Sequence, residues 1–94
     1  MATGVDLIKK ERWKQITTHD FTIGYDVANN SKGQLLYAAR RITSTVPQKY
    51  KPPVGWDKNR WIKMCGYPME SRMILAGAWI AAELDRLQHL AINP

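Results

Sequence analysis

The segment from Pro68 to Leu87 constrains the fold more than any other part of the chain. Its residues Leu75, Trp79 and Ala82 recur at intervals of three and four, which is the spacing of one face of an α-helix. Charged residues fall on a neighbouring stripe of the same helix, at Arg72, Glu83 and Arg86. A polar stripe beside a buried face forms either a salt-bridge seam or the wall of a ligand site.

The chain has 94 residues, which suits one domain over residues 1–94 with an ordered core over about residues 6–90. A chain of this size buries roughly two thirds of the surface that it exposes when unfolded. The composition is 45% hydrophobic and 23% charged, as in globular proteins, and four Trp and four Tyr supply large contact surfaces. We therefore expect an ordered domain without internal repeats.

Few residues are suited to metal or redox chemistry. Cys65 is the only cysteine, so it cannot form an internal disulfide and is expected to be a packing residue. His19 and His89 are too few to complete a zinc framework with it. The sequence has no glycine-rich phosphate loop, metal-binding histidine–glutamate helix or nucleophile elbow. We predict no catalytic residue, no cofactor and no metal site, so an enzyme is not the favoured class.

Targeting signals are also lacking in the sequence. The first residues do not combine a basic stretch with an apolar run, and no segment reaches about 18 uninterrupted apolar residues. The expected location is a reducing cytosol, without membrane association.

Positive charge is concentrated in one segment. The net charge is +6, and residues 40–63 account for all of it. Seven cations lie there against the single acid Asp57: Arg40, Arg41, Lys49, Lys51, Lys58, Arg60 and Lys63. A concentrated positive field favours phosphorylated small molecules or polyanions as partners. The alternative is an ordinary solvated basic surface.

Periodicity predicts two helices in the first half of the chain. Asp6 is placed to cap a helix that runs to about Thr17, and Ser31 is placed to cap another through about Thr45. Residues 18–30, between them, are rich in turn formers and are expected to be an ordered loop. The expected apolar positions are Leu7, Ile8, Trp13 and Ile16 in the first helix, and Leu35, Leu36, Ala38, Ala39 and Ile42 in the second.

Capping signals predict two more helices. Three prolines in residues 46–56 predict a connection without regular structure. Asp57 is placed to cap a short helix through Met64 that Gly66 ends, and Pro68 suits the first turn of the last helix. The expected fold class is all-α, a small bundle of about four helices with a long ordered loop and a Pro-rich connection.

Two sets of polar residues are candidates for ligand contacts. Glu11 and Gln15 are four residues apart, so both project from one helix face, where they can bind ribose hydroxyls or an amide. Glu83 has apolar neighbours that predict partial burial, and a buried carboxylate needs a partner. The candidate partners are Arg12, Arg72 and Arg86.

Aromatic and basic residues alternate at Trp56, Arg60, Trp61 and Lys63. Bases stack on aromatic rings while cations bind phosphate, so this combination is typical of nucleotide sites and single-strand binders. Trp61 and Trp79 are expected in the core. Trp56 follows a glycine near prolines and is expected to be the most exposed of the three rings.

Several short motifs together resemble a group of small phage and prophage proteins. The motifs are Glu11-Arg12-x-x-Gln15, the Thr22 to Asp26 turn, Leu35-x-x-Ala38-Ala39, Trp56, and Arg72-x-x-Leu75-x-Ala-Gly-Ala-x-Ile-x-Ala-Glu-Leu-Asp-Arg. The similarity covers residues 7–88. Members often carry Glu-His-Asp-Asp where this chain reads Gly24-Tyr25-Asp26-Val27, so only Asp26 is kept. If that cluster supports metal-dependent hydrolysis in other members, its loss here implies binding without turnover.

The resemblance and the residues predict a phage-encoded binding protein in the host cytoplasm. Its expected ligand is a phosphorylated small molecule, such as a nucleotide signal of host antiviral defence. Arg60, Lys63 and Arg72 would neutralise phosphates, and Trp56 or Tyr50 would stack on a base. A site shared within a homo-oligomer suits so short a chain. The predicted ligand-binding residues are Glu11, Arg12, Gln15, Asp26, Tyr50, Trp56, Arg60, Lys63, Arg72, Glu83 and Arg86.

Two alternative functions stay open on the sequence alone. A small phage effector would dock on a host protein or a nucleic acid through its basic residues 40–63. A metal-dependent nucleotide hydrolase would need several acids to converge on a divalent ion. Those acids would be Glu11, Asp26, Glu83 and Asp85.

Overall fold

The computed structural model describes residues 2–93, which form helices and no strand. The elements are α1 (Gly4–His19), α2 (Ile23–Asn29), α3 (Gln34–Ile42), the short 3-10 helix η1 (Pro47–Lys49), α4 (Lys58–Cys65) and α5 (Met69–Ile92). The all-α prediction is confirmed, with one α-helix more than the four expected. Within residues 2–93, no helix is both long enough and apolar enough to span a bilayer.

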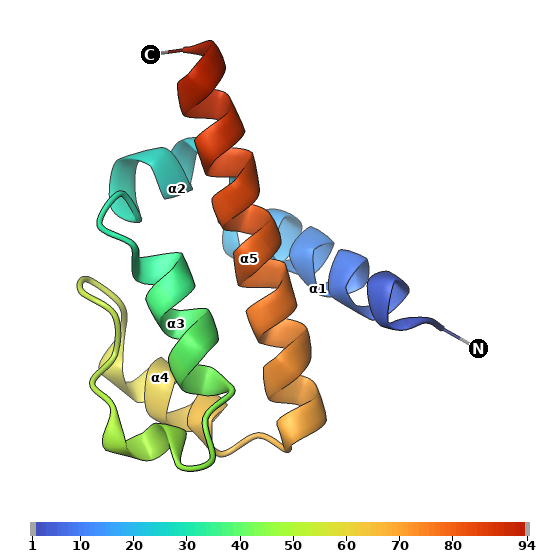
Figure 1. The fold of residues 1–94 in the computed structure, drawn as a ribbon, viewed down its shortest axis with the longest axis vertical. Coiled ribbons are helices and arrows are strands. Elements are labelled where there is room, and N and C mark those ends of the chain that lie inside the picture. The colour runs from blue at the N-terminus through green and yellow to red at the C-terminus, as the bar shows by residue number, and fades with distance from the viewer. Residues whose placement is uncertain (1, 94) are drawn as a thin grey trace.

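Helix α5 is the element against which α1, α2 and α3 pack. It runs along the length of the molecule, with α3 beside it and α1 crossing it (Figure 1). Helix α2 packs near the C-terminal part of α5, and α4 lies at the opposite end, beside η1 (Figure 1). The sequence segment that most constrained the prediction is thus the centre of the fold.

The core forms where α3, α4 and α5 meet. Trp61 and Ile42 are almost completely buried, and Trp79 lies beside Trp61 with ring centroids 6.5 Å apart. The predicted core positions of α3 are confirmed except for Leu36, which is 39% exposed. The buried cluster consists of Leu35, Ala38, Ala39, Ile42, Trp61, Met64, Cys65, Leu75, Ala76, Trp79 and Ala82.

Helix α1 begins earlier than predicted. Thr3, not Asp6, is its N-cap: the Thr3 hydroxyl accepts a hydrogen bond from the Asp6 backbone N–H at 3.2 Å. The Asp6 carboxylate in turn accepts from the Thr3 backbone N–H at 3.1 Å, which lowers the pKa of Asp6. This reciprocal pair is a capping box, in which the acid occupies the third helical position.

The buried face of α1 is polar, which the sequence pattern did not indicate. Arg12 and Gln15 are buried, whereas Trp13, one of the expected apolar positions, is 67% exposed. The apolar pattern was misleading here because α1 contacts its neighbours partly through charged and amide groups. Those groups also line a cavity between α1 and α2.

Residues 18–30 contain a helix, so the prediction of a loop there was wrong. The Thr22 hydroxyl accepts from the Tyr25 backbone N–H at 3.2 Å and starts α2. Helical spacing places Asp26 and Asn30 on the inner side, both buried. A short helix of this kind depends on tertiary contacts more than on its own sequence.

Other boundaries differ less from the prediction. Helix α3 starts after Gly33, whose φ of 77° suits glycine, rather than at Ser31, and it ends at Ile42 rather than near residue 45. Asp57 caps α4 as predicted, accepting from the Arg60 backbone N–H at 2.8 Å, and Gly66 follows its last turn.

Gly77 allows close contact between α1 and α5. A Cβ at this position would lie 2.5 Å from Ile8 Cδ1 and 2.7 Å from Ile8 Cγ1. Gly77→Ala should therefore lower the free energy of unfolding by about 1 kcal/mol, because overpacking of roughly 2 kcal/mol exceeds a gain in helix propensity of roughly 1 kcal/mol.

In an Ile8→Ala background, which removes the clash, Gly77→Ala should instead stabilise the protein by about 1 kcal/mol. Denaturant unfolding of the four variants tests this change of sign. Stabilisation in both backgrounds would contradict the close contact.

Candidate ligand-binding pocket

A pocket of about 260 Å³ lies beside the core, between α1, α2, α4 and α5. One side is apolar, because residues of the core cluster reach it from three helices. These are Leu35, Met64, Leu75, Trp79 and Ala82. The other side is polar and comes mainly from α1 and α2: Glu11, Arg12, Gln15, Asp26 and Asn30. Flat, partly polar molecules suit a cavity with these two kinds of wall.

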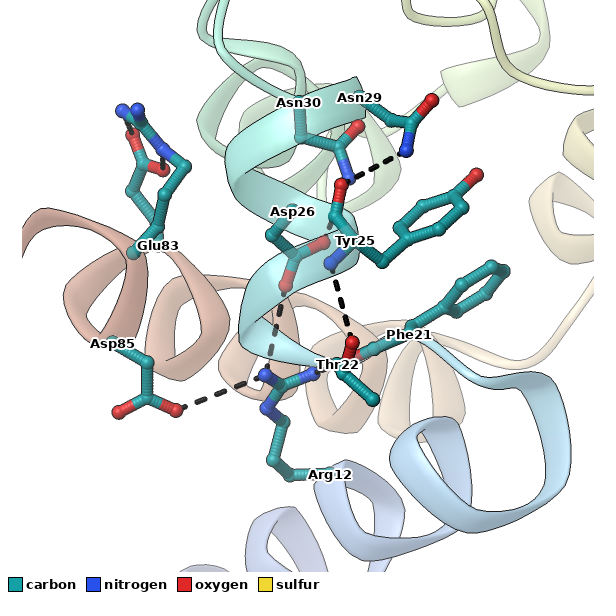
Figure 2. Close-up of polar contacts among 10 residues, drawn as sticks. Arg12, Phe21, Thr22, Tyr25, Asp26, Asn29, Asn30, Glu83 and Asp85 are labelled. Atoms are coloured by element: carbon teal, nitrogen blue, oxygen red, sulfur yellow. Dashed lines mark hydrogen bonds and ion pairs between the residues drawn. The ribbon is translucent and has the colours of Figure 1, made fainter. Parts of the chain in front are cut away.

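Arg12 and Asp26 form the most buried part of the polar wall. The Arg12 Nη1 donates to the Phe21 carbonyl at 2.9 Å. Its Nη2 lies 3.6 Å from Asp26 Oδ2 and 3.7 Å from Asp85 Oδ2, as Figure 2 shows. The side chains of Arg12 and Asp26 are only 9% and 2% exposed. A charged pair with this burial needs good hydrogen bonds to be favourable.

The pair leaves hydrogen-bonding capacity unused. Among residues 2–93, no partner within hydrogen-bond distance reaches Asp26 Oδ2, Arg12 Nε or Arg12 Nη2. Asp26 Oδ1 accepts from Asn30 Nδ2 at 2.8 Å. Burial raises the pKa of Asp26, and the Asn30 bond and the Arg12 charge offset part of that rise. Unpaired buried groups of this kind are uncommon and often belong to functional sites.

Behind this wall, a bidentate ion pair on α5 joins Glu83 and Arg86. Arg86 Nε donates to Glu83 Oε1 at 2.6 Å, and Nη2 donates to Oε2 at 3.0 Å. This bond raises the pKa of Arg86. Of the three arginines proposed as partners for Glu83, the structure selects Arg86.

Trp56 forms the wall between the core and the mouth of the pocket. Its ring is half-buried and meets the Trp79 ring edge-on, with centroids 5.2 Å apart and planes at 73°. The indole N–H donates to Asn30 Oδ1 at 2.8 Å. Gly55, with φ of 82°, turns the chain just before it. The Trp56 ring therefore lines the pocket, while its indole N–H is already hydrogen-bonded to Asn30.

A wider and more basic hollow, of about 800 Å³, adjoins the pocket. The two share Glu11, Asp57, Arg60, Met64 and Leu75 among their lining residues. The outer hollow adds the cations Lys14 and Lys63 and the imidazole of His19. Arg60 stands where the two meet, with its guanidinium 5.2 Å from the centre of the Phe21 ring. A ligand longer than the pocket would extend past Arg60 towards these positive groups.

The structure brings together six of the predicted ligand-binding residues in the pocket: Glu11, Arg12, Gln15, Asp26, Trp56 and Arg60. Gln15 Nε2 lies 3.4 Å from Glu11 Oε2, which agrees with their expected common face. Lys63 lines the outer hollow. Glu83 and Arg86 line neither hollow but lie close enough to Asp26 to influence its charge.

Arg72 and Tyr50 lie elsewhere. Arg72 was expected to bind phosphate, but its Nη1 donates to the carbonyls of Ile42 and Ser44, each at 2.9 Å. It thereby binds backbone carbonyls at the end of α3. The Tyr50 ring lies 4.6 Å from the Arg41 guanidinium carbon, on the basic segment.

Sequence reasoning missed Phe21, Tyr25 and Asn30 as pocket residues. Thr22 followed by Asp26 and Asn30 carried a weak signal, because a capping residue before a buried i, i+4 pair is typical of a short helix. The alternating apolar residues obscured it.

No protein-family model, curated protein or solved structure matches this chain. The described part of the chain also contains no group of three or more His, Cys, Asp or Glu side chains placed to hold a metal ion. No three of Glu11, Asp26, Glu83 and Asp85, the acids that a metal-dependent hydrolase would need, are placed to share one ion. The function is accordingly inferred from the geometry of the pocket and the hollow.

Replacing Glu83 tests the pair behind the pocket. Glu83→Ala should lower the free energy of unfolding by about 3 kcal/mol, because it leaves the buried Arg86 guanidinium without its carboxylate. Glu83→Gln, which keeps one acceptor oxygen, should lose less. Denaturant unfolding measures both, with the exposed Gln88→Ala on the same helix as control. If Glu83→Ala is as stable as this control, the pair does not support the fold.

Proposed function

We propose that this protein binds and sequesters a phosphorylated small molecule, of which a nucleotide is the best fit, without converting it. The observation that supports this most is the continuity of a partly aromatic pocket with a basic outer hollow through Arg60. A nucleotide has the same two halves, a flat heterocycle and an anionic tail.

The charges favour one orientation of such a ligand. Three carboxylates line the pocket, Glu11, Asp26 and Asp57, against the two guanidiniums of Arg12 and Arg60, so a phosphate placed there would meet an excess of negative charge. The outer hollow shares Glu11 and Asp57 with the pocket but has three cations, Lys14, Arg60 and Lys63, so phosphates would be stabilised better there. The ligand thus enters with its ring first, between the Trp56 wall and the polar wall. In the phage setting that the sequence resemblance implies, the sequestered nucleotide would be a signal of host antiviral defence.

Calorimetry with nucleoside mono-, di- and cyclic phosphates tests this proposal. At least one should bind and be recovered unchanged when the mixture is separated by chromatography. Arg60→Ala and Lys63→Ala should each weaken binding by about tenfold, the loss of one charge-assisted hydrogen bond.

Lys58→Ala is the matched control, because Lys58 is exposed on the same helix and lines neither hollow. Its binding should stay within about twofold of the unchanged protein. No heat with any member of the panel, or an equal loss in the Lys58 variant, would contradict the proposed phosphate contacts.

A second candidate function, nucleic-acid binding, is favoured by a separate observation. Arg40, Lys49 and Lys51 are exposed and line neither hollow, and Arg41 lies against the rings of Tyr37 and Tyr50. If these cations bind a nucleic acid, log affinity should fall linearly with log salt, by roughly 0.7 to 0.9 per phosphate contacted. Replacing the three exposed cations with alanine should reduce that slope. A flat salt response, or no binding at low salt, would exclude this function.

A further inference from the structure

One side of α5 presents a row of apolar residues to solvent. Four of them are about half exposed: Met73, at 58%, Ile80, at 44%, Leu84, at 56%, and Leu87, at 49%. Leu75 and Ala82, which are buried in the core, lie on the opposite side of the helix because a turn takes about 3.6 residues. Single exposed apolar residues are common on protein surfaces, but a continuous row of them marks an interaction site.

The spacing of the row is that of a seam between two helices. The four residues are separated by seven, four and three positions, as are the a and d positions of a heptad. No charged residue lies between Arg72 and Glu83, so charge does not interrupt the central part of the row. At about 1.5 Å per residue, the row extends over roughly 21 Å from Met73 to Leu87. A surface that is long, narrow and apolar suits another helix as its partner.

The row is complementary to a second copy of itself. In an antiparallel pair with a two-fold axis at Ile80, each Ile80 meets its copy, and Met73 meets Leu87 because both lie seven residues from Ile80. A parallel pair would instead place the exposed carboxylate of Glu70 beside its copy and align the two helix dipoles. Like charges and aligned dipoles are both unfavourable, so the antiparallel pair is favoured.

The exposed apolar area is what such a pair needs. Met69 and Ala91 are also exposed, and they extend the row at its two ends, eleven residues to either side of Ile80. The six residues together leave on the order of 500 Å² of apolar surface exposed in each copy. A standard interface buries about 800 Å² per partner, of which about 60% is apolar, or about 500 Å².

We propose that two copies of this protein pair through α5, antiparallel, about a two-fold axis at Ile80. This inference goes beyond the proposed function, because the row lies on the opposite side of α5 from Leu75 and Ala82, which line the pocket. Pairing therefore leaves the contribution of α5 to the pocket unchanged.

Light scattering on the full chain measures the number of subunits. At high micromolar concentration the unchanged protein should have twice the mass of one chain. Leu84→Lys places a charge in the seam and should shift the protein to the mass of one chain. His89→Lys is the matched control, since His89 is exposed on the same helix but lies away from the row, and it should stay paired. Thermal melts should show both variants folded, because both positions are exposed.

Cysteine cross-linking tests the register of the pair. Ile80→Cys should form a disulfide-linked dimer on mild oxidation, because the two copies of this position meet at the axis. Met73→Cys alone should not, because its two copies are about 21 Å apart along the helices. A mixture of Met73→Cys and Leu87→Cys should link. The unchanged protein is the control, since its own Cys65 is 2% exposed.

Three results would overturn the proposal. The first is a single-chain mass for the unchanged protein at high micromolar concentration; binding to phosphatidylcholine vesicles that Leu84→Lys abolishes would then assign the row to a lipid surface. The second is a Met73→Cys copy that links to itself, which requires a parallel pair. The third is a dimer that persists in Leu84→Lys, which places the interface elsewhere. Nucleotide affinity should be the same in Leu84→Lys and the unchanged protein, so failure of the pairing does not touch the proposed function.

Discussion

The buried guanidinium of Arg12 is the interaction on which the arrangement of helices depends. A single side chain donates to the Phe21 carbonyl in the turn after α1 and faces carboxylates on α2 and α5. Because a buried cation is stable only when it is paired, these partners fix how α2 and α5 lie relative to α1. The polar wall of the pocket is a result of the same arrangement. Arg12 therefore both supports the fold and lines the candidate binding pocket.

The apolar part of the fold could be predicted from the sequence. Helix α5 and the inner face of α3 follow the helical period, and Trp61 and Trp79 are buried as their neighbours indicated. Local signals also predicted α4 correctly, because contacts within a few residues fix its two ends, at Asp57 and at Gly66. These features depend on short-range chemistry or on simple hydrophobic burial, and both can be recognised in a single sequence.

The polar part of the fold could not be predicted in the same way. Helix α2 has only seven residues, and its position depends on an aspartate whose partner, Arg12, lies fourteen residues earlier in the chain. The spacing of Glu11 and Gln15 was enough to place them on one face. By contrast, Arg72 looked like a phosphate ligand until tertiary structure placed it beside carbonyls 28 and 30 residues away. Long-range polar contacts of this kind leave no periodic pattern in the sequence.

The side-chain amide of Asn30 has a consequence for the motion of the pocket. Its nitrogen donates to Asp26 and its oxygen accepts from the Trp56 indole, so it joins α2 to the segment that carries the aromatic wall. Tilting α2 away from the pocket would break the bond to Trp56 or move Trp56 with the helix. The position of α2 and the position of the Trp56 wall are therefore coupled through this amide. The separation of these two walls of the pocket is therefore set in part by one side-chain amide.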